Sequence, residues 1–114
     1  MANVYTNYKA VLTTSASTTL YTVPSETTGI IKSLRVTNTD EQTDCKIRAF
    51  LLDSSSVSYT IETNRNIQKG TSEELFNSYA FSTSPVVLKE SEKINVQAEN
   101  GGDLHVILSV LEIS

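Results

Sequence analysis

Hydrophobic and polar residues alternate along most of this chain, and the alternation predicts short β-strands. The clearest example is residues 45–52, because a period of two places successive side chains on opposite faces of a strand. One face of this segment is apolar and consists of Cys45, Ile47, Ala49 and Leu51. Residues 57–62 alternate in the same way after a serine-rich turn. The two segments therefore predict a β-hairpin.

Further strand-like segments recur at spacings of roughly 8–15 residues, with turn residues between them. They cover residues 3–13, 18–23, 30–38, 86–88, 92–99 and 103–113. The less regular stretch 64–84 predicts a long loop with one strand near residues 74–77. The series predicts an all-β fold, an antiparallel β-sandwich or jelly-roll-like architecture of about eight short strands. We expect residues 1–114 to form a single domain, with residues 1–13 as an extended arm or an edge strand.

The final segment differs from the others because it is apolar on both faces. One face carries Leu104, Val106, Leu108 and Val110, and the other carries His105, Ile107, Leu111 and Ile113. A strand that is apolar on both faces needs cover on both. We expect the second cover to be either a loop of this chain or another subunit. The second alternative predicts these candidate subunit contacts: Val4, Tyr5, Tyr8, Val11, His105, Ile107, Leu111 and Ile113.

Composition and charge narrow the class of protein. Serine and threonine make up about a quarter of the chain, which favours strands with polar outer faces. The net charge of −4 argues against nucleic acid or an anionic membrane as the main partner, because both are negatively charged and bind positively charged protein surfaces. No apolar run is long enough for a transmembrane helix, and the N-terminus has no signal-peptide pattern. The chain is therefore expected to be made in a cytoplasm.

The inventory of reactive side chains argues against an enzyme, since the chain has one His and one Cys. Cys45 lies on an apolar strand face and is expected to be a small buried hydrophobe. The acidic turn with Asp40, Glu41 and Asp44 has no EF-hand spacing, so we predict a solvated turn and no metal or cofactor. Gly101 and Gly102 predict a hairpin turn, and the scattered tyrosines leave glycan binding as an alternative function.

Three segments resemble small structural proteins of tailed-bacteriophage virions: residues 1–5 (MANVY), 20–38 (LYTVPSETTGIIKSLRVTN) and 106–114 (VILSVLEIS). The similarity covers most of the chain, is weakest over residues 64–84, and is a pattern of strands and turns without a chemical site to carry over. It implies a non-enzymatic β-sandwich subunit of the virion, made in the host bacterial cytoplasm. The implied role is a capsid decoration (cement) protein, a homo-oligomer that binds the major capsid protein or other virion proteins. The alternative is a neck, tail or fibre-associated protein, including a receptor- or glycan-binding module.

Overall fold

The computed structural model of the chain describes residues 3–75, 86–99 and 104–114, and within these ranges it contains nine strands and no helix. The strands are β1 (Asn3–Leu12), β2 (Thr18–Thr22), β3 (Thr28–Asn38), β4 (Cys45–Leu52), β5 (Ser58–Ile67), β6 (Ser72–Glu74), β7 (Val86–Leu88), β8 (Lys93–Ala98) and β9 (Leu104–Ile113). The predicted all-β class is confirmed. The described residues accordingly include no helix that could cross a membrane.

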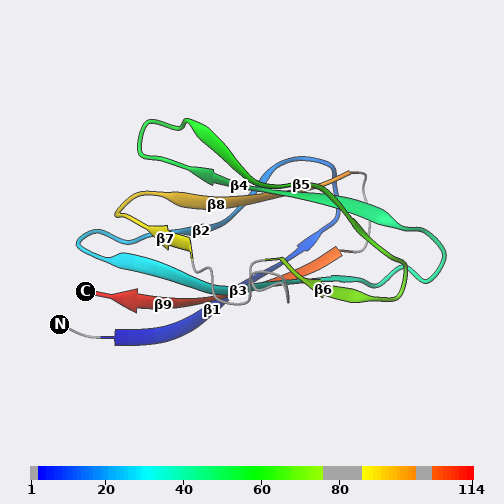
Figure 1. Cartoon of the computed structure of the whole chain (residues 1–114), viewed down its shortest axis with the longest axis horizontal. Coiled ribbons are helices and arrows are strands. Elements are labelled where there is room, and N and C mark those ends of the chain that lie inside the picture. The colour runs from blue at the N-terminus through cyan, green and yellow to red at the C-terminus, as the bar shows by residue number, and fades with distance from the viewer. Residues whose placement is uncertain (1–2, 76–85, 100–103) are drawn as a thin grey trace.

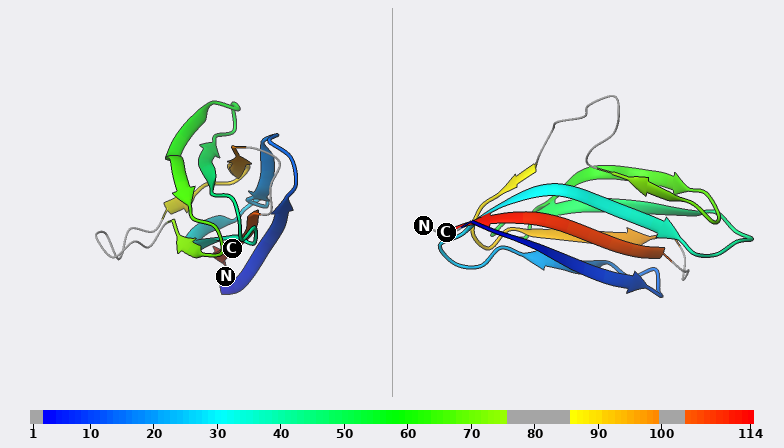
Figure 2. Two further views of the ribbon diagram at one scale, coloured as in Figure 1. Left: turned by 90° about the vertical axis from the view of Figure 1, so that its right-hand side faces the viewer. Right: turned by 90° about the horizontal axis from the view of Figure 1, so that it is seen from below.

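The strands form two antiparallel sheets that pack face to face (Figures 1 and 2). Sheet A has the order β1-β9-β3-β6, with β7 also paired to β3, and sheet B has the order β2-β8-β4-β5. The chain crosses between the sheets after β1, β2, β3, β5, β7 and β8. The resulting body is elongated, with extents of 47 × 29 × 21 Å. The predicted β-sandwich is therefore confirmed.

The strand order is that of a jelly roll once β6 and β7 are considered together. Strand β7 pairs with residues 29–31 of β3, and β6 pairs with residues 35–37 of the same strand. The two short strands thus occupy one position at the edge of sheet A. Each sheet then has four strand positions, which matches the eight strands of a jelly roll and the predicted number.

The core lies between the inner faces of the sheets and is built by the alternation seen in the sequence. Strand β9 contributes Leu104, Val106, Leu108 and Val110, all at most 1% exposed. Strand β4 contributes Cys45, Ile47 and Ala49 from the opposite sheet. Leu34 and Val36 of β3 and Ile94 and Val96 of β8 complete the central layer. The face of β9 that the pattern assigned to the core is the buried one.

Strand β5 is longer than the predicted segment 57–62. It continues to Ile67, and its pairing with β4 shifts register twice, between Ile47 and Ala49 and between Ala49 and Phe50. Asn64 has a positive φ of 43° within this strand. The irregularity interrupts the alternation of side chains, which hides the second half of the strand in the sequence.

The strand predicted near residues 74–77 lies slightly earlier in the chain. Strand β6 covers Ser72–Glu74, and Leu75 follows it as a buried residue outside the strand. Residues 76 and 77 lie outside the described residues, as does the predicted hairpin turn at Gly101 and Gly102. At the start of the chain, residues 3–12 form the edge strand β1, paired along its whole length with β9.

Candidate interaction surface

The outer face of sheet A carries a row of apolar residues that crosses four strands. In the antiparallel registers Tyr5 lies opposite Leu111, Leu111 opposite Ile30, and Ile30 opposite Val87. Directly opposed residues share a face of the sheet. Their neighbours Val110 and Ile31 are buried, so the row itself points away from the core. Four adjacent strands therefore present one continuous apolar row.

A second apolar area lies further along the same outer face. Val11 is opposite His105, and Lys9 is opposite Ile107. These four residues, with Ala10 and Val106 between them, line a shallow hollow of about 410 Å³. We call the two areas together the apolar face. It consists of Tyr5, Val11, Ile30, Val87, Ile107, Leu111 and Ile113.

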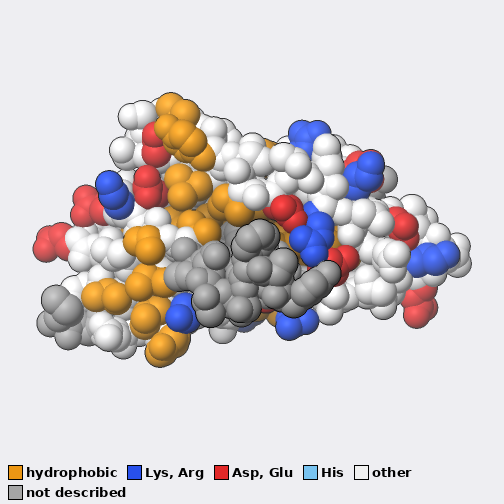
Figure 3. Space-filling view, in the orientation of Figure 1, with side chains coloured by type: hydrophobic (Ala, Val, Ile, Leu, Met, Phe, Trp, Pro, Cys, Tyr) orange, Lys and Arg blue, Asp and Glu red, His pale blue; other side chains and the backbone are white. Residues whose placement is uncertain are grey.

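The apolar face is accessible in the described chain. Tyr5 is 74% exposed, Val87 55%, Val11 54% and Ile107 44%. Figure 3, which views the sandwich from the edge formed by β5, β6 and β7, shows hydrophobic side chains in the half that holds β7, over the ends of both sheets. Outer faces of antiparallel sandwiches are usually polar. A contiguous apolar outer face is therefore a candidate docking surface.

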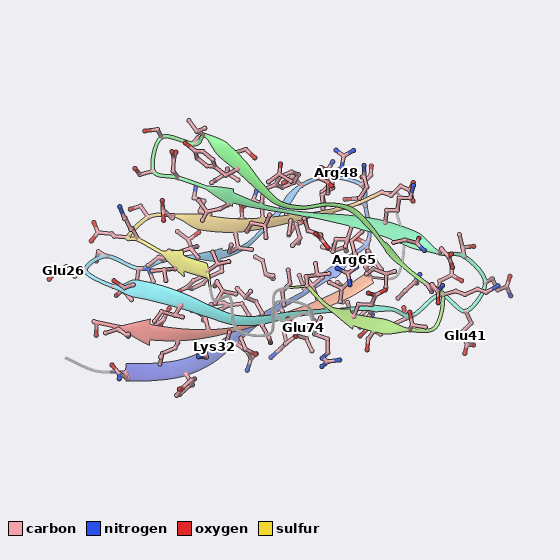
Figure 4. The ribbon with its side chains drawn as sticks, in the orientation of Figure 1. Glu26, Lys32, Glu41, Arg48, Arg65 and Glu74 are labelled. Carbon is pink, nitrogen blue, oxygen red and sulfur yellow. The ribbon has the colours of Figure 1, made fainter. Side chains whose placement is uncertain are left out.

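The charges beside the apolar face are basic. Lys9 and Arg35 flank Ile107 on its two sides in the sheet, and Lys32 lies at the bulge of β3 and points away from the sandwich (Figure 4). None of the outward side chains of β1, β9 and β3 is an aspartate or glutamate. The chain as a whole has a net charge of −4. On this sheet the acidic side chain that shares the outer face is Glu74 of β6, opposite Arg35. Around the apolar face itself the charges of β1 and β3 are basic, which suits a neutral or acidic partner surface.

The structure divides the predicted contact residues into two groups by the face on which they lie. Six point outward and join the hollow and the apolar face: Tyr5, Val11, His105, Ile107, Leu111 and Ile113. Val4 and Tyr8 lie on the inner face of β1, opposite Glu112 and Leu108. Tyr8 packs against the hydrophobic core, whereas Val4 is 49% exposed at the end of the strand. The even numbering of Val4 and Tyr8, shared with buried Leu12, is the sequence signal for this difference.

Tyr8 belongs to a polar cluster that joins the two sheets. The Tyr21 hydroxyl, from β2 of sheet B, donates a 2.7 Å hydrogen bond to Oε2 of Glu112 on β9 of sheet A. The Tyr8 hydroxyl donates a longer bond, 3.5 Å, to the same oxygen. The two rings pack with their centroids 4.7 Å apart. Burial and then the hydrogen bond to Glu112 raise the pKa of Tyr21.

A second polar cluster joins the sheets on the opposite side of the sandwich. The Arg65 guanidinium of β5 lies 2.7 Å from Glu62 and 2.7 Å from Glu73 of β6. Figure 4 shows Arg65 between the sheets. Its side chain is 35% exposed, so solvent and salt screen these pairs. The cluster is consistent with a structural role at this edge.

The outer face of sheet B is more polar than that of sheet A. It contains a hollow of about 270 Å³ lined by Lys46, Arg48, Asn64, Gln97, Ala98 and Glu99. Arg48 donates a 2.8 Å hydrogen bond from Nε to Oδ1 of Asn64 and points away from the core (Figure 4). Phe50 and Leu52 are half-buried on the same sheet. This hollow is the polar counterpart of the apolar hollow on sheet A.

The acidic turn after β3 is organised by local hydrogen bonds. Buried Asn38 donates to the carbonyls of Thr43 and Ile67, and its side-chain oxygen accepts from the Asp40 amide. Asp44 accepts bonds from the Lys69 amide and the Asn66 side chain, which lower the pKa of its carboxyl. The described residues contain no group of His, Cys, Asp and Glu placed to hold a metal ion. Cys45 is 4% exposed and lies in the core.

Comparisons with known proteins give the fold. No protein-family model matches the sequence, and no curated protein matches it significantly. The chain is similar to a chain in the acid-stable capsid structure of Helicobacter pylori bacteriophage KHP30, with 10% identity and a TM-score of 0.57 over 100% of this chain and 94% of that chain. It is also similar to a chain in the structure of infectious bursal disease virus strain Gx, with 12% identity and a TM-score of 0.54.

The second match covers 97% of this chain but only 32% of the viral chain, so this chain spans about a third of its length. Identities this low show a common fold. Both similar chains come from virus particles, as the names of their structures state.

Proposed function

We propose that this protein is a non-enzymatic structural subunit of a virion, and specifically a capsid decoration protein of a tailed bacteriophage. It binds the major capsid protein, or another virion protein, through the apolar face of sheet A. The single observation that carries this proposal is the outward apolar row that crosses β1, β9, β3 and β7, which is exposed at Tyr5 and Val87 and half-buried between them. The fold similarity to chains of virus particles supports it. A fold alone does not establish a function, so the surface is the stronger argument.

The energetics of the apolar face favour docking. Fully burying an exposed valine or isoleucine side chain contributes about 1.5–3 kcal/mol, and burying one that is already half-buried contributes roughly half as much. Tyr5, Val11, Val87 and Ile107 are each at least 44% exposed, and each would lose this surface in a contact. The occupancy of equivalent sites on a particle then follows from the affinity of each contact and the concentration of free subunit. The basic rim at Lys9, Lys32 and Arg35 predicts that the opposing shell surface is acidic or neutral.

The chemistry of the chain agrees with a structural role. Cys45 is buried in the core, while His105 lies at the outer face of β9 beside Val11. These two residues lie on different sheets and different faces, so they form no nucleophile and base pair. The proposal therefore includes no catalytic residue.

The proposal is tested by binding the purified protein to particles that lack it. We expect wild-type protein to bind on the order of hundreds of copies per particle, as symmetric decoration of a shell requires. Val87→Lys places a charge on the apolar face and should abolish most binding. Val57→Lys is the matched control, because Val57 is similarly exposed, 48% against 55%, but lies in the turn between β4 and β5. Equal binding of the two variants would refute docking through sheet A.

A second candidate function rests on the polar hollow of sheet B. Lys46, Arg48, Asn64 and Gln97 offer hydrogen-bond donors in a concave site, which favours a receptor or glycan ligand for a tail or fibre-associated protein. Arg48→Ala should then abolish binding of purified host-cell polysaccharide, measured by calorimetry, and should leave attachment to the particle unchanged. No heat of binding with the wild-type protein would exclude this candidate.

A further inference from the structure

Among the residues that the structure describes, strand β1 pairs on one side only, with β9, and forms a free edge of sheet A with a regular backbone. It pairs with β9 over ten consecutive residues without a register shift. The ladders of β2 with β8, β3 with β9, and β4 with β5 all contain a shift. Figure 2 shows β1 at the outer margin of the sandwich. A long regular edge presents a row of backbone groups that can pair with another strand.

The other edge strands carry features that oppose such pairing. Strand β2 has only five residues and a register shift, and β6 and β7 have three residues each. Strand β5 contains the irregularity at Asn64 and the Arg65 ion pairs. Short length, bulges and charges are the usual protections of a free edge. Strand β1 has none of them except the single charge of Lys9.

The charge distribution identifies a second copy of this chain as a suitable partner for β1. Residues 3–25 contain no aspartate or glutamate, and Lys9 is their only charged side chain. Two copies that each carry a net charge of −4 can therefore approach through this edge with their acidic residues on other parts of the surface. An antiparallel pair of identical strands also satisfies the twofold symmetry of a homodimer.

We propose that two copies of this chain pair antiparallel through β1, with Asn7 of one copy opposite Asn7 of the other. This register places Tyr5 opposite Lys9 of the second copy, and Val4 opposite Ala10 of the second copy. Each pair in this register joins two odd-numbered or two even-numbered residues, and therefore two side chains on the same face of the sheet. The two sheets A become one continuous sheet. The inference is independent of the proposed function.

The side chains complement each other in this register. Tyr5 is 74% exposed, and its ring would receive the Lys9 ammonium of the second copy, a cation–π contact that occurs twice by symmetry. Val4 is 49% exposed and Ala10 half-buried on the inner face, so their pairing extends the core. The two Lys9 residues lie on opposite sides of the twofold axis. The only charge of the edge therefore faces an aromatic ring and not its own copy.

A cysteine pair tests the register directly. In Asn7→Cys the new thiols meet at the twofold axis, so mild oxidation should produce a disulfide-linked dimer. At the same time point the control variant should still be monomeric. The control is Val11→Cys, whose thiols lie on opposite sides of the axis and too far apart for a disulfide. The native Cys45 is buried in both variants. Failure of Asn7→Cys to cross-link, or equal cross-linking of both variants, would overturn the proposed pairing.

Sedimentation equilibrium then measures the dimer without a covalent bond. We expect the wild-type protein to dimerise reversibly, and Tyr5→Lys to weaken dimerisation about tenfold or more, since it places two like-charge pairs across the interface. Tyr5→Glu is the matched variant of opposite charge, and it should retain dimerisation through two pairs with Lys9. A wild-type monomer up to about 1 mM, the weak end of specific association, would contradict the inference. Equal affinities of the two variants would do so as well.

Discussion

Sheets A and B bury similar inner faces but present different outer ones. Inside, each sheet contributes alternate aliphatic side chains, such as Leu108 from β9 and Ile47 from β4, both fully buried. Outside, sheet A shows an apolar row and a basic rim, whereas sheet B has a hollow lined by polar and charged groups. The free edge of sheet A is regular, and both edges of sheet B are irregular.

This difference separates residues that form the fold from residues that are available for a partner. A sandwich needs only its inner faces to fold, so an outer face is free to carry other properties. In this chain the outer face of sheet A is not uniformly polar, and its free edge β1 is neither short nor bulged. Both therefore lack the usual features that prevent association with other proteins. The features that favour a protein partner therefore lie mainly on sheet A, while sheet B carries the polar hollow and, at its β4–β5 end, the exposed Val57 and Tyr59.

The largest expected effect distinguishes the two faces of β9. Leu108→Ala removes a fully buried side chain and should lower the free energy of unfolding by about 2–5 kcal/mol, measured by urea denaturation. Its neighbour Ile107 points outward and is 44% exposed, so Ile107→Ser should change stability by only about 0.5 kcal/mol. Attachment to the particle should show the reverse order. A large loss of stability in Ile107→Ser would show that this face belongs to the core.

The polar cluster of Tyr8, Tyr21 and Glu112, which joins the sheets and is called the Tyr21 seam below, is expected to give the next largest loss of stability when it is changed. Tyr21→Phe removes the 2.7 Å hydrogen bond to the Glu112 carboxylate and should cost about 1.5–3 kcal/mol in unfolding free energy. A structural bond of this kind should leave the oligomeric state unchanged.

The same bond predicts an alkaline dependence of stability. Because burial and Glu112 raise the pKa of Tyr21 above its ordinary value of 10.0, the folded state holds the phenolic proton more tightly than the unfolded state. The contribution is complete below pH 10 and falls as the pH rises above it. Tyr21→Phe should flatten this alkaline decline, and Tyr8, whose pKa is also raised, should account for a remainder. An unchanged slope would contradict the assignment.

Gly29 tests how closely the sheets approach at this seam. A Cβ at position 29 would lie 2.9 Å from the Tyr21 hydroxyl oxygen and 3.2 Å from its Cε2 atom. Gly29→Ala should therefore cost about 1–3 kcal/mol through overpacking. The cost should be smaller in the Tyr21→Phe background, in which the nearest atom is absent. Purely additive effects of the two substitutions would show that the contact is relieved by movement of the backbone.

The opposite seam at Arg65 is expected to give the smallest effect. Arg65→Gln removes ion pairs with Glu62 and Glu73 that are about a third exposed, so the loss should be at most about 1 kcal/mol. It should diminish further in high salt, whereas the effect of Tyr21→Phe should not. A loss larger than that of Tyr21→Phe would reverse our ranking of the two seams.

The sequence predicted the fold class because most strands alternate without interruption. Residues 45–52 and 86–88 match β4 and β7, and the inner face of β9 was assigned correctly. The second half of β5 was missed, since the positive φ at Asn64 and the shifted register interrupt the period of two. Strands β6 and β7 share one position at the edge of sheet A. The sequence does not reveal this arrangement, because three residues are too few to show a clear alternation.

The candidate surface was predictable only in part. The outer apolar residues of β9 were identified from alternation, but Ile30 and Val87 join them only through the registers of β3 with β9 and β7. Those registers are set by long-range pairing, which alternation does not encode. The contact residues themselves remain a prediction, with Val4 and Tyr8 on the other face of β1.

The most direct test of the central claim is a cryo-electron microscopy reconstruction of particles that carry this protein. The account predicts that the outer face of sheet A rests on the shell, with Val87 and Ile107 buried in the contact and the hollow of sheet B open to solvent. A reconstruction in which sheet A faces solvent, or in which the protein is absent from the particle, would contradict it.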